Sequence, residues 1–180
     1  MMEYSDKKSN KPLTILGIDP GYAILGWGVI EYQASRHRLL GYGTVETSKD
    51  FSMPERLKEI YIGLNEVIAK YDPDVSAIEE LFFNSNQKTA IKVGEARGAA
   101  VLACANAGLH VYEYTPLQIK QALTGYGRAE KQQIQEMVRQ VLGLIKAPSP
   151  DDAADAVACA ICHANSSAHI KLMGRAGAVQ

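Results

Sequence analysis

Several features that mark particular protein classes are scarce or missing in this sequence of 180 residues. The three cysteines are an odd number and fall in segments with a helical pattern, so we do not expect a disulfide scaffold. The N-terminus lacks a secretory pattern, and no apolar run is long enough to cross a bilayer. We therefore expect a cytoplasmic protein with no membrane-spanning segment.

Basic and acidic residues are also nearly equal in number. The 19 basic and 20 acidic residues give a net charge of −1. Domains that bind nucleic acid are often basic overall, so such a partner would have to meet a local basic patch. Hydrophobic residues make up 47% of the chain, enough for the core of one domain. We place this domain at residues 13–165, between a disordered N-terminal tail, 1–12, and a frayed C-terminal tail, 166–180.

Apolar periodicity predicts an α/β fold. The expected strands are residues 13–19, 24–32, 38–47, 75–80 and 109–114, and the expected helices are residues 53–71, 88–107, 116–123, 129–142 and 150–165. Short polar links favour an antiparallel meander of the first three strands. The order of the elements predicts a mixed sheet with helices on both faces.

Carboxylates stand at the ends of two expected strands. Asp19 directly precedes Pro20-Gly21, where its side chain either points into a ligand-binding crevice or only shapes the turn. Glu79 and Glu80 end the fourth strand, and alternation places them on opposite faces of the sheet. The pattern decides neither the role of Asp19 nor which glutamate faces the crevice.

A third group of acids begins the last expected helix. Ser149 and Pro150 are typical of a helix start, and the helix dipole favours Asp151 and Asp152 in the first turn. Asp155 lies too far along for this explanation and shares a face with Asp152. Neighbouring carboxylates repel each other, a cost that a bound divalent cation would remove. Magnesium prefers such oxygen ligands, and two ions roughly 3.5–4 Å apart can activate water and stabilise the leaving oxygen of a phosphodiester.

Five motifs occur in order between Leu13 and Ala164. They are GIDPG (17–21), AIEELFF (77–83), KVGEARGAA (92–100), YTPLQIKQALTGYGRAEKQQIQEMV (114–138) and DDAADAVACAICHA (151–164). Together they resemble the RuvC family of crossover (Holliday) junction endodeoxyribonucleases. GIDPG alone is weakly specific, whereas the whole set in register is strongly specific.

The resemblance implies a ribonuclease H-like fold with a mixed five-stranded sheet. It places the family's catalytic, metal-binding acids at Asp19, Glu79, Asp152 and Asp155, where some relatives have histidine in place of Asp152. It also implies magnesium or manganese as cofactor, with two ions per site. The implied activity is that of a homodimer that makes paired nicks in four-way DNA junctions, leaving 5′-phosphate and 3′-hydroxyl ends, during recombination and repair. The implied partner is the RuvA–RuvB branch-migration complex.

Basic and aromatic residues near the acids are candidate DNA contacts. The resemblance implies that Lys120 and Lys131, on either side of a Gly-Tyr-Gly link, bind phosphates; Arg128 is a further candidate on local charge alone. Phe82 is implied to stack on a base, and we expect Phe83 to pack in the core. Taken singly, scattered lysines and arginines are usually ordinary surface charges, and an aromatic residue after a strand more commonly packs in the core.

The expected helix 88–107 is rich in small residues, which permit close packing against another helix. Packing within the monomer explains this pattern, and the implied homodimer makes the helix a candidate interface. The sequence therefore leaves both arrangements open.

Two other functions compete with the nuclease. The first is a DNA-structure-binding module whose acids serve only as helix caps. The second is an ATP-binding protein of the actin-like superfamily, because GIDPG resembles the first phosphate loop of that superfamily. The chain of 180 residues is too short for the two domains that an actin-like fold requires.

Overall fold

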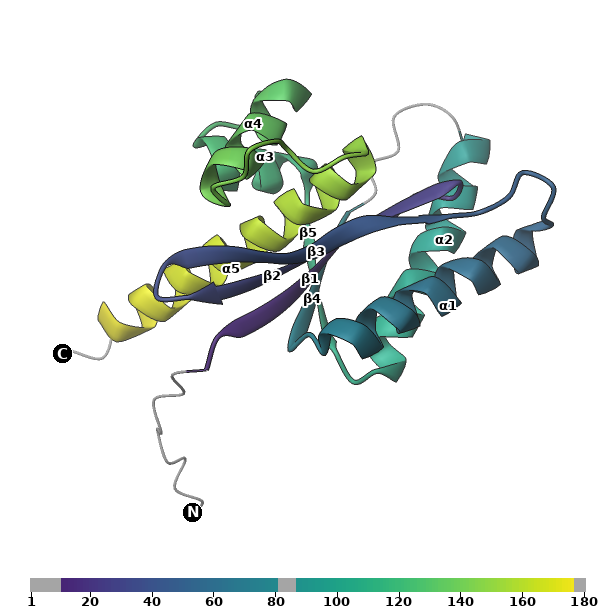
Figure 1. Cartoon of the computed structure of the whole chain (residues 1–180), viewed down its shortest axis with the longest axis horizontal. Coiled ribbons are helices and arrows are strands. Elements are labelled where there is room, and N and C mark those ends of the chain that lie inside the picture. Colours follow the sequence, from purple (N-terminus) through teal and green to yellow (C-terminus); the bar gives the residue numbers. More distant parts are fainter. Residues whose placement is uncertain (1–10, 81–86, 177–180) are drawn as a thin grey trace, which may run out of the picture.

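A mixed five-stranded sheet forms the centre of the molecule (Figure 1). The computed structural model describes residues 11–80 and 87–176, with side chains for residues 11–80 and 89–166. The strands are β1 (Leu13–Asp19), β2 (Ile24–Gln33), β3 (Arg36–Glu46), β4 (Val75–Glu79) and β5 (His110–Tyr114). Their order in the sheet is β3-β2-β1-β4-β5. The first three form the predicted antiparallel meander, and β4 and β5 continue the sheet parallel to β1.

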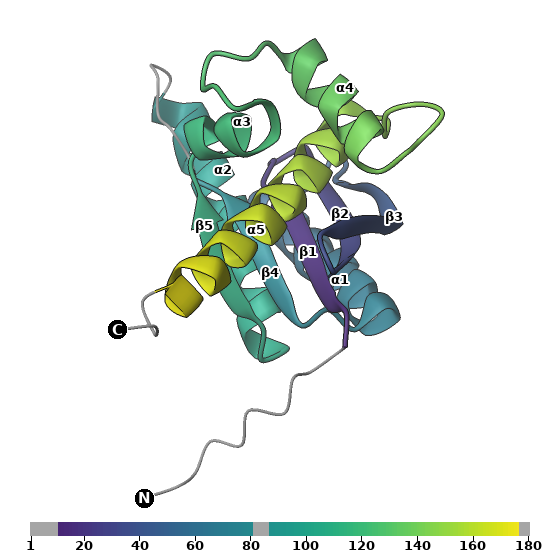
Figure 2. The ribbon, with the colours of Figure 1, turned by 90° about the vertical axis from the view of Figure 1, so that its left-hand side faces the viewer.

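Helices cover both faces of this sheet, and the predicted fold class is confirmed. The helices are α1 (Met53–Tyr71), α2 (Gln87–Asn106), α3 (Pro116–Thr124), α4 (Lys131–Val141) and α5 (Asp151–Ala176). α1 and α2 lie together on one face, and α5 crosses the other face with α3 and α4 packed on its outer side (Figure 2). Among the helices described, none is both long and apolar enough to span a membrane.

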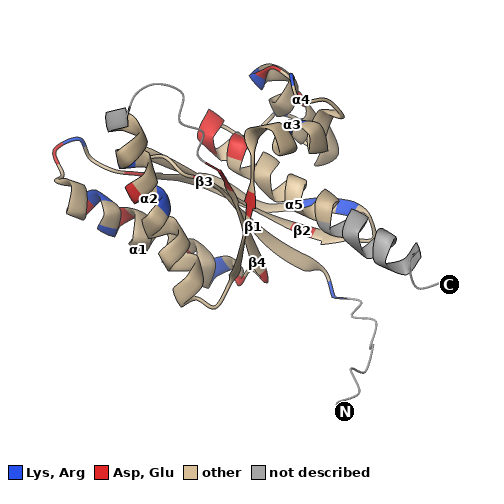
Figure 3. Ribbon diagram, turned by 180° about the vertical axis from the view of Figure 1, so that it is seen from behind, with Lys and Arg blue, Asp and Glu red and all other residues tan. Residues whose placement is uncertain are grey.

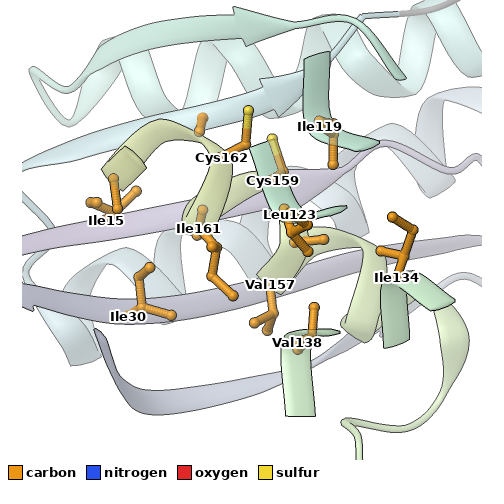
Figure 4. Close-up of a cluster of buried hydrophobic side chains, with 14 of the residues drawn as sticks. Ile15, Ile30, Ile119, Leu123, Ile134, Val138, Val157, Cys159, Ile161 and Cys162 are labelled. Carbon is orange, nitrogen blue, oxygen red and sulfur yellow. The ribbon is translucent and has the colours of Figure 1, made fainter. Parts of the chain in front are cut away.

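α5 departs from the sequence pattern more than the other elements. Its predicted end is residue 165, whereas the helix continues to Ala176. Val157 and Ile161 share one face of the helix and Cys159 lies on the opposite face, yet all three are completely buried (Figure 4). The sheet covers one side of α5 while α3 and α4 cover the other. A helix that is buried all round has no amphipathic pattern, so the helical wheel alone could not identify a buried face.

Glycines in β1 and β2 allow the backbone of α5 to lie directly on the sheet. A Cβ atom added at Gly17 would stand 2.0 Å from the carbonyl oxygen of Ala156, and one at Gly26 would stand 1.9 Å from that of Asp152. Neither oxygen can move without shifting the helix. The absence of side chains at these two positions therefore sets how closely the first turns of α5 approach the sheet.

We predict that Gly17→Ala lowers the free energy of unfolding by about 1–3 kcal/mol or more, because the added methyl group overpacks this contact. The matched control is Gly41→Ala in β3, whose new Cβ would meet only the far end of the Tyr71 side chain. That end can swing away, so the control should cost less. Denaturant titration measures both, and equal losses would contradict a backbone contact between α5 and β1.

Candidate active site

Two of the acids stand at neighbouring strand ends. β1 and β4 are adjacent parallel strands, so Asp19 and Glu79 lie side by side at their carboxyl ends. Ile15 and Ala77 pack in the core beneath α5. Side chains alternate along a strand, so Asp19 and Glu79 project to that same face, whereas Glu80 follows on the other. The position of α5 thus shows which face of the sheet holds the acids, and Glu79 is the glutamate on the same face as Asp19.

The first turns of α5 bring Asp152 and Asp155 over these strand ends. Figure 3 shows the acidic residues that gather at the start of α5. Asp155 and Glu79 line a pocket of about 310 Å³. The pocket is also lined by Pro116, Ile119, Lys120, Lys131, Ile134 and Ala158. Acidic groups from the sheet and from α5 therefore share one depression with two basic side chains.

α3 and α4 carry the two lysines to this pocket. Tyr114 pairs with Glu79 in the sheet, and the chain turns into α3 immediately afterwards. Thr115 caps that helix: its hydroxyl accepts a hydrogen bond from the backbone N–H of Gln118, with a donor–acceptor distance of 3.1 Å. α3 therefore begins beside the end of β4, which places Lys120 at the pocket.

Burial and neighbouring carboxylates raise the pKa values of Asp19 and Glu79. The pKa of Asp19 is raised to about 7, mainly by burial and then by repulsion from Glu79, Asp155 and Asp152. The pKa of Glu79 is raised to about 6, again mainly by burial and then by Asp155, although nearby lysines oppose the shift. Each shift records the cost of placing negative charge in a partly desolvated cluster. The four acids therefore form one electrostatic unit.

Lys131 brings a cation into this cluster. Its Nζ atom lies 3.0 Å from Oδ2 of Asp155 and 3.2 Å from Oδ2 of Asp151. Burial raises the pKa of Asp155, and Lys131 opposes that rise. The hydrogen bond from Lys131, followed by one from Gln135, lowers the pKa of Asp151. From the sequence, Asp151 is explained as an acid in the first turn that the helix dipole favours. In the structure it also contacts the site through Lys131. No local sequence signal predicts this contact, because it depends on how α4 packs over α5.

The remaining predicted contacts are placed differently. Arg128 is exposed between α3 and α4 and does not line the pocket. Phe82 and Phe83 lie outside the residues that the structure describes. Within the described residues, no three acidic, histidine or cysteine side chains are arranged to hold a metal ion as they stand. One of the acids, Asp155, is already paired with the ammonium group of Lys131.

Comparison with known proteins identifies the family. The family model "Crossover junction endodeoxyribonuclease RuvC" matches residues 15–163. The chain belongs to the RuvC family. It is 56% identical to crossover junction endodeoxyribonuclease RuvC of Alkaliphilus metalliredigens over an alignment of 154 residues. This alignment covers 86% of this chain and 94% of that protein. The corresponding protein of Alkaliphilus oremlandii is 57% identical over 154 residues, with the same coverage.

A solved structure agrees with this assignment. Thermus thermophilus RuvC in complex with Holliday junction substrate superposes with a TM-score of 0.82 at 42% sequence identity, covering 86% of this chain and 94% of that chain. The fold is therefore the ribonuclease H-like fold of RuvC, as the motifs implied.

The electrostatic cluster predicts how stability depends on pH in the absence of metal. Because the pKa of Asp19 rises from its ordinary value of 3.8 to about 7 on folding, the folded protein retains a proton that the unfolded chain releases. Stability should therefore fall as pH rises from about 4 to about 7. Asp19→Asn removes this loss, so we expect a gain on the order of a few kcal/mol at pH 8 and almost none near pH 4. Denaturant titration in the presence of a chelator measures both values.

Glu80→Gln is the matched control for that experiment, since Glu80 is a neighbouring acid on the opposite side of the strand. Its stability should follow that of the parent across the same pH range. A constant gain for Asp19→Asn at every pH would show that the carboxyl group of Asp19 does not carry the predicted electrostatic cost.

Proposed function

We propose that this protein resolves four-way DNA junctions as a structure-specific endodeoxyribonuclease. Paired symmetric nicks would leave 5′-phosphate and 3′-hydroxyl ends, in recombination and repair. The observation that carries this proposal is the meeting of carboxylates from β1, β4 and α5 beside two lysines of α3 and α4. Buried acids with raised pKa values are typical of functional sites. Membership of the RuvC family supplies the reaction.

We propose that the four acids hold magnesium or manganese, with two ions per site. Asp19 and Glu79 would bind from the sheet, and Asp152 and Asp155 from α5. Their oxygen atoms are ligands that both metals accept. Burial and then repulsion between carboxylates raise the pKa values of Asp19 and Glu79, and a divalent cation would relieve that repulsion. Bound ions of this kind activate a water molecule and stabilise the leaving oxygen of a phosphodiester.

The basic residues of the chain would position the DNA. Lys120 and Lys131 line the pocket beside the acids, where each can neutralise a backbone phosphate. Arg128 is exposed further out and would extend this basic surface. Base stacking by Phe82, and action together with a RuvA–RuvB complex, are proposed on family membership alone.

The outer face of α2 is the surface we propose for a two-fold dimer. Gly94 and Gly98 lie one turn apart, and a Cβ added at either would meet nothing within 4 Å, so packing within the chain does not require glycine at these positions. Ile91 and Leu102 on the same helix are 63% and 53% exposed. Small residues between exposed apolar side chains favour close approach of a second helix. One complete acid set per chain would then give the two nicks that a junction needs.

The dimer predicts a change in mass when the apolar surface of α2 is made charged. Light scattering of the parent should report twice the chain mass of 19.6 kDa, whereas Leu102→Asp should shift the protein toward a single chain mass. Ile145→Asp is the matched control, because Ile145 is 94% exposed but lies between α4 and α5. A parent that remains a monomer while making paired nicks would refute the dimer.

The nuclease itself is tested by converting each acid to its amide. Asp19→Asn, Glu79→Gln, Asp152→Asn and Asp155→Asn should each reduce nicking of a synthetic four-way junction in magnesium by at least about a hundredfold, since each removes a charged ligand. Junction binding should be retained, because the proposed phosphate contacts are lysines. Nicking rate, junction affinity and melting temperature should be measured on every variant.

Glu80→Gln should cut at nearly the parental rate, since its side chain leaves the opposite face of the sheet. The competing function, a DNA-structure-binding module without catalysis, requires that the parent bind the junction and never nick it. An inactive Glu80 variant beside a normally active Glu79 variant would show that the wrong glutamate has been assigned to the site.

A further inference from the structure

One lysine joins α4 to the first two turns of α5. Lys131 is the first residue of α4, and its Nζ atom lies 3.0 Å from Oδ2 of Asp155 and 3.2 Å from Oδ2 of Asp151. The two aspartates are four residues apart on α5 and therefore share a face of that helix. A single ammonium group thus bridges two carboxylates that would otherwise repel each other.

The two carboxylates have different surroundings. The side chain of Asp155 is 30% exposed and lines the pocket with Glu79, whereas that of Asp151 is 65% exposed and is not part of the lining. Gln135, one turn after Lys131 on α4, donates a hydrogen bond of 2.8 Å from Nε2 to Oδ1 of Asp151. One oxygen of Asp151 is therefore held by Gln135, and the other is left for Lys131.

We propose that the ammonium of Lys131 occupies Asp155 until a divalent cation arrives, and that Asp151, oriented by Gln135, then retains the displaced ammonium beside the pocket. Asp151 and Gln135 are positioning residues in this arrangement. The inference rests on the proposed function, because it takes Asp155 to be a metal ligand. An ammonium nitrogen 3.0 Å from Oδ2 of Asp155 competes for that oxygen and repels a second cation.

This exchange couples the metal to DNA. With Asp155 occupied by a cation, Lys131 pairs with one carboxylate instead of two, and its charge becomes more available to a phosphate. It stays close to Lys120, which lines the same pocket. Among the described residues, Lys131 forms ion pairs with Asp151 and Asp155, so without Asp151 the displaced lysine would return to Asp155 in competition with the ion.

The test is a titration of the DNA-free protein with Mn²⁺, followed by the electron paramagnetic resonance signal of the free ion. Lys131→Met should tighten Mn²⁺ binding by about two- to fivefold, the range that corresponds to an ion pair of this exposure. Asp151→Asn should weaken Mn²⁺ binding by a similar factor in the parent. In the Lys131→Met background the same Asp151→Asn substitution should have almost no effect, because its influence passes through the lysine.

A different result is expected if Asp151 acts only as a distant negative charge, since Asp151→Asn would then weaken Mn²⁺ binding equally in both backgrounds. That outcome would overturn the exchange. Asp151→Glu should restore parental binding, and Glu59→Gln on α1, across the sheet, should leave Mn²⁺ binding unchanged. Melting temperatures confirm that each variant is folded.

Two amide variants separate this inference from the function on which it rests. If Asp19→Asn and Asp155→Asn lose Mn²⁺ binding while Lys131→Met binds like the parent, the acids hold the metal and only the exchange is wrong. If both amide variants bind Mn²⁺ like the parent, the proposed metal site fails, and the exchange fails with it.

Discussion

Gly17, Gly26 and Gly28 leave part of the sheet surface bare, and the backbone of α5 lies directly upon it. The carbonyl oxygen of Asp152 rests against Gly26, so the depth of this contact determines how far the acids of α5 stand from those of the strands. Methyl groups at these glycines would have to displace the helix, because the nearest atoms belong largely to its backbone. The arrangement of the whole site therefore depends on three positions that carry no side chain.

Bringing carboxylates this close has a cost that the structure offsets only in part. Burial and mutual repulsion raise the pKa of Asp19 to about 7, and Lys131 compensates only some of the negative charge. Such a cluster weakens the folded state without metal, and selection for stability alone would remove it. The surrounding core, in which residues of α5 such as Val157 and Ile161 are fully buried, supplies the stability that lets the cluster persist.

Sequence patterns predicted the bounds of an element well where one of its faces is buried and the other meets solvent. The bounds of α1 match the pattern because one face of that helix packs on α2 and the sheet while the other meets solvent. The prediction ended α5 at residue 165 because the sequence from Ser166 is small and polar, whereas the helix continues to Ala176. Strand alternation places Glu79 and Glu80 on opposite faces of the sheet but does not say which face holds the site. The family resemblance selects Glu79, and the position of α5 selects the same residue independently. The contact of Lys131 with Asp151 was unpredictable, since it depends on the packing of two helices.

The acids come from β1, near the start of the chain, from β4, near its middle, and from α5, near its end. Because α5 is the last of these elements to be synthesised, a ribosome-bound chain that lacks it holds at most the two acids of the strands. Such a chain lacks two of the four acids that we propose as metal ligands, whatever part of the sheet has already formed. The order of the elements along the polypeptide thus keeps the proposed cutting site from forming before α5 has been made.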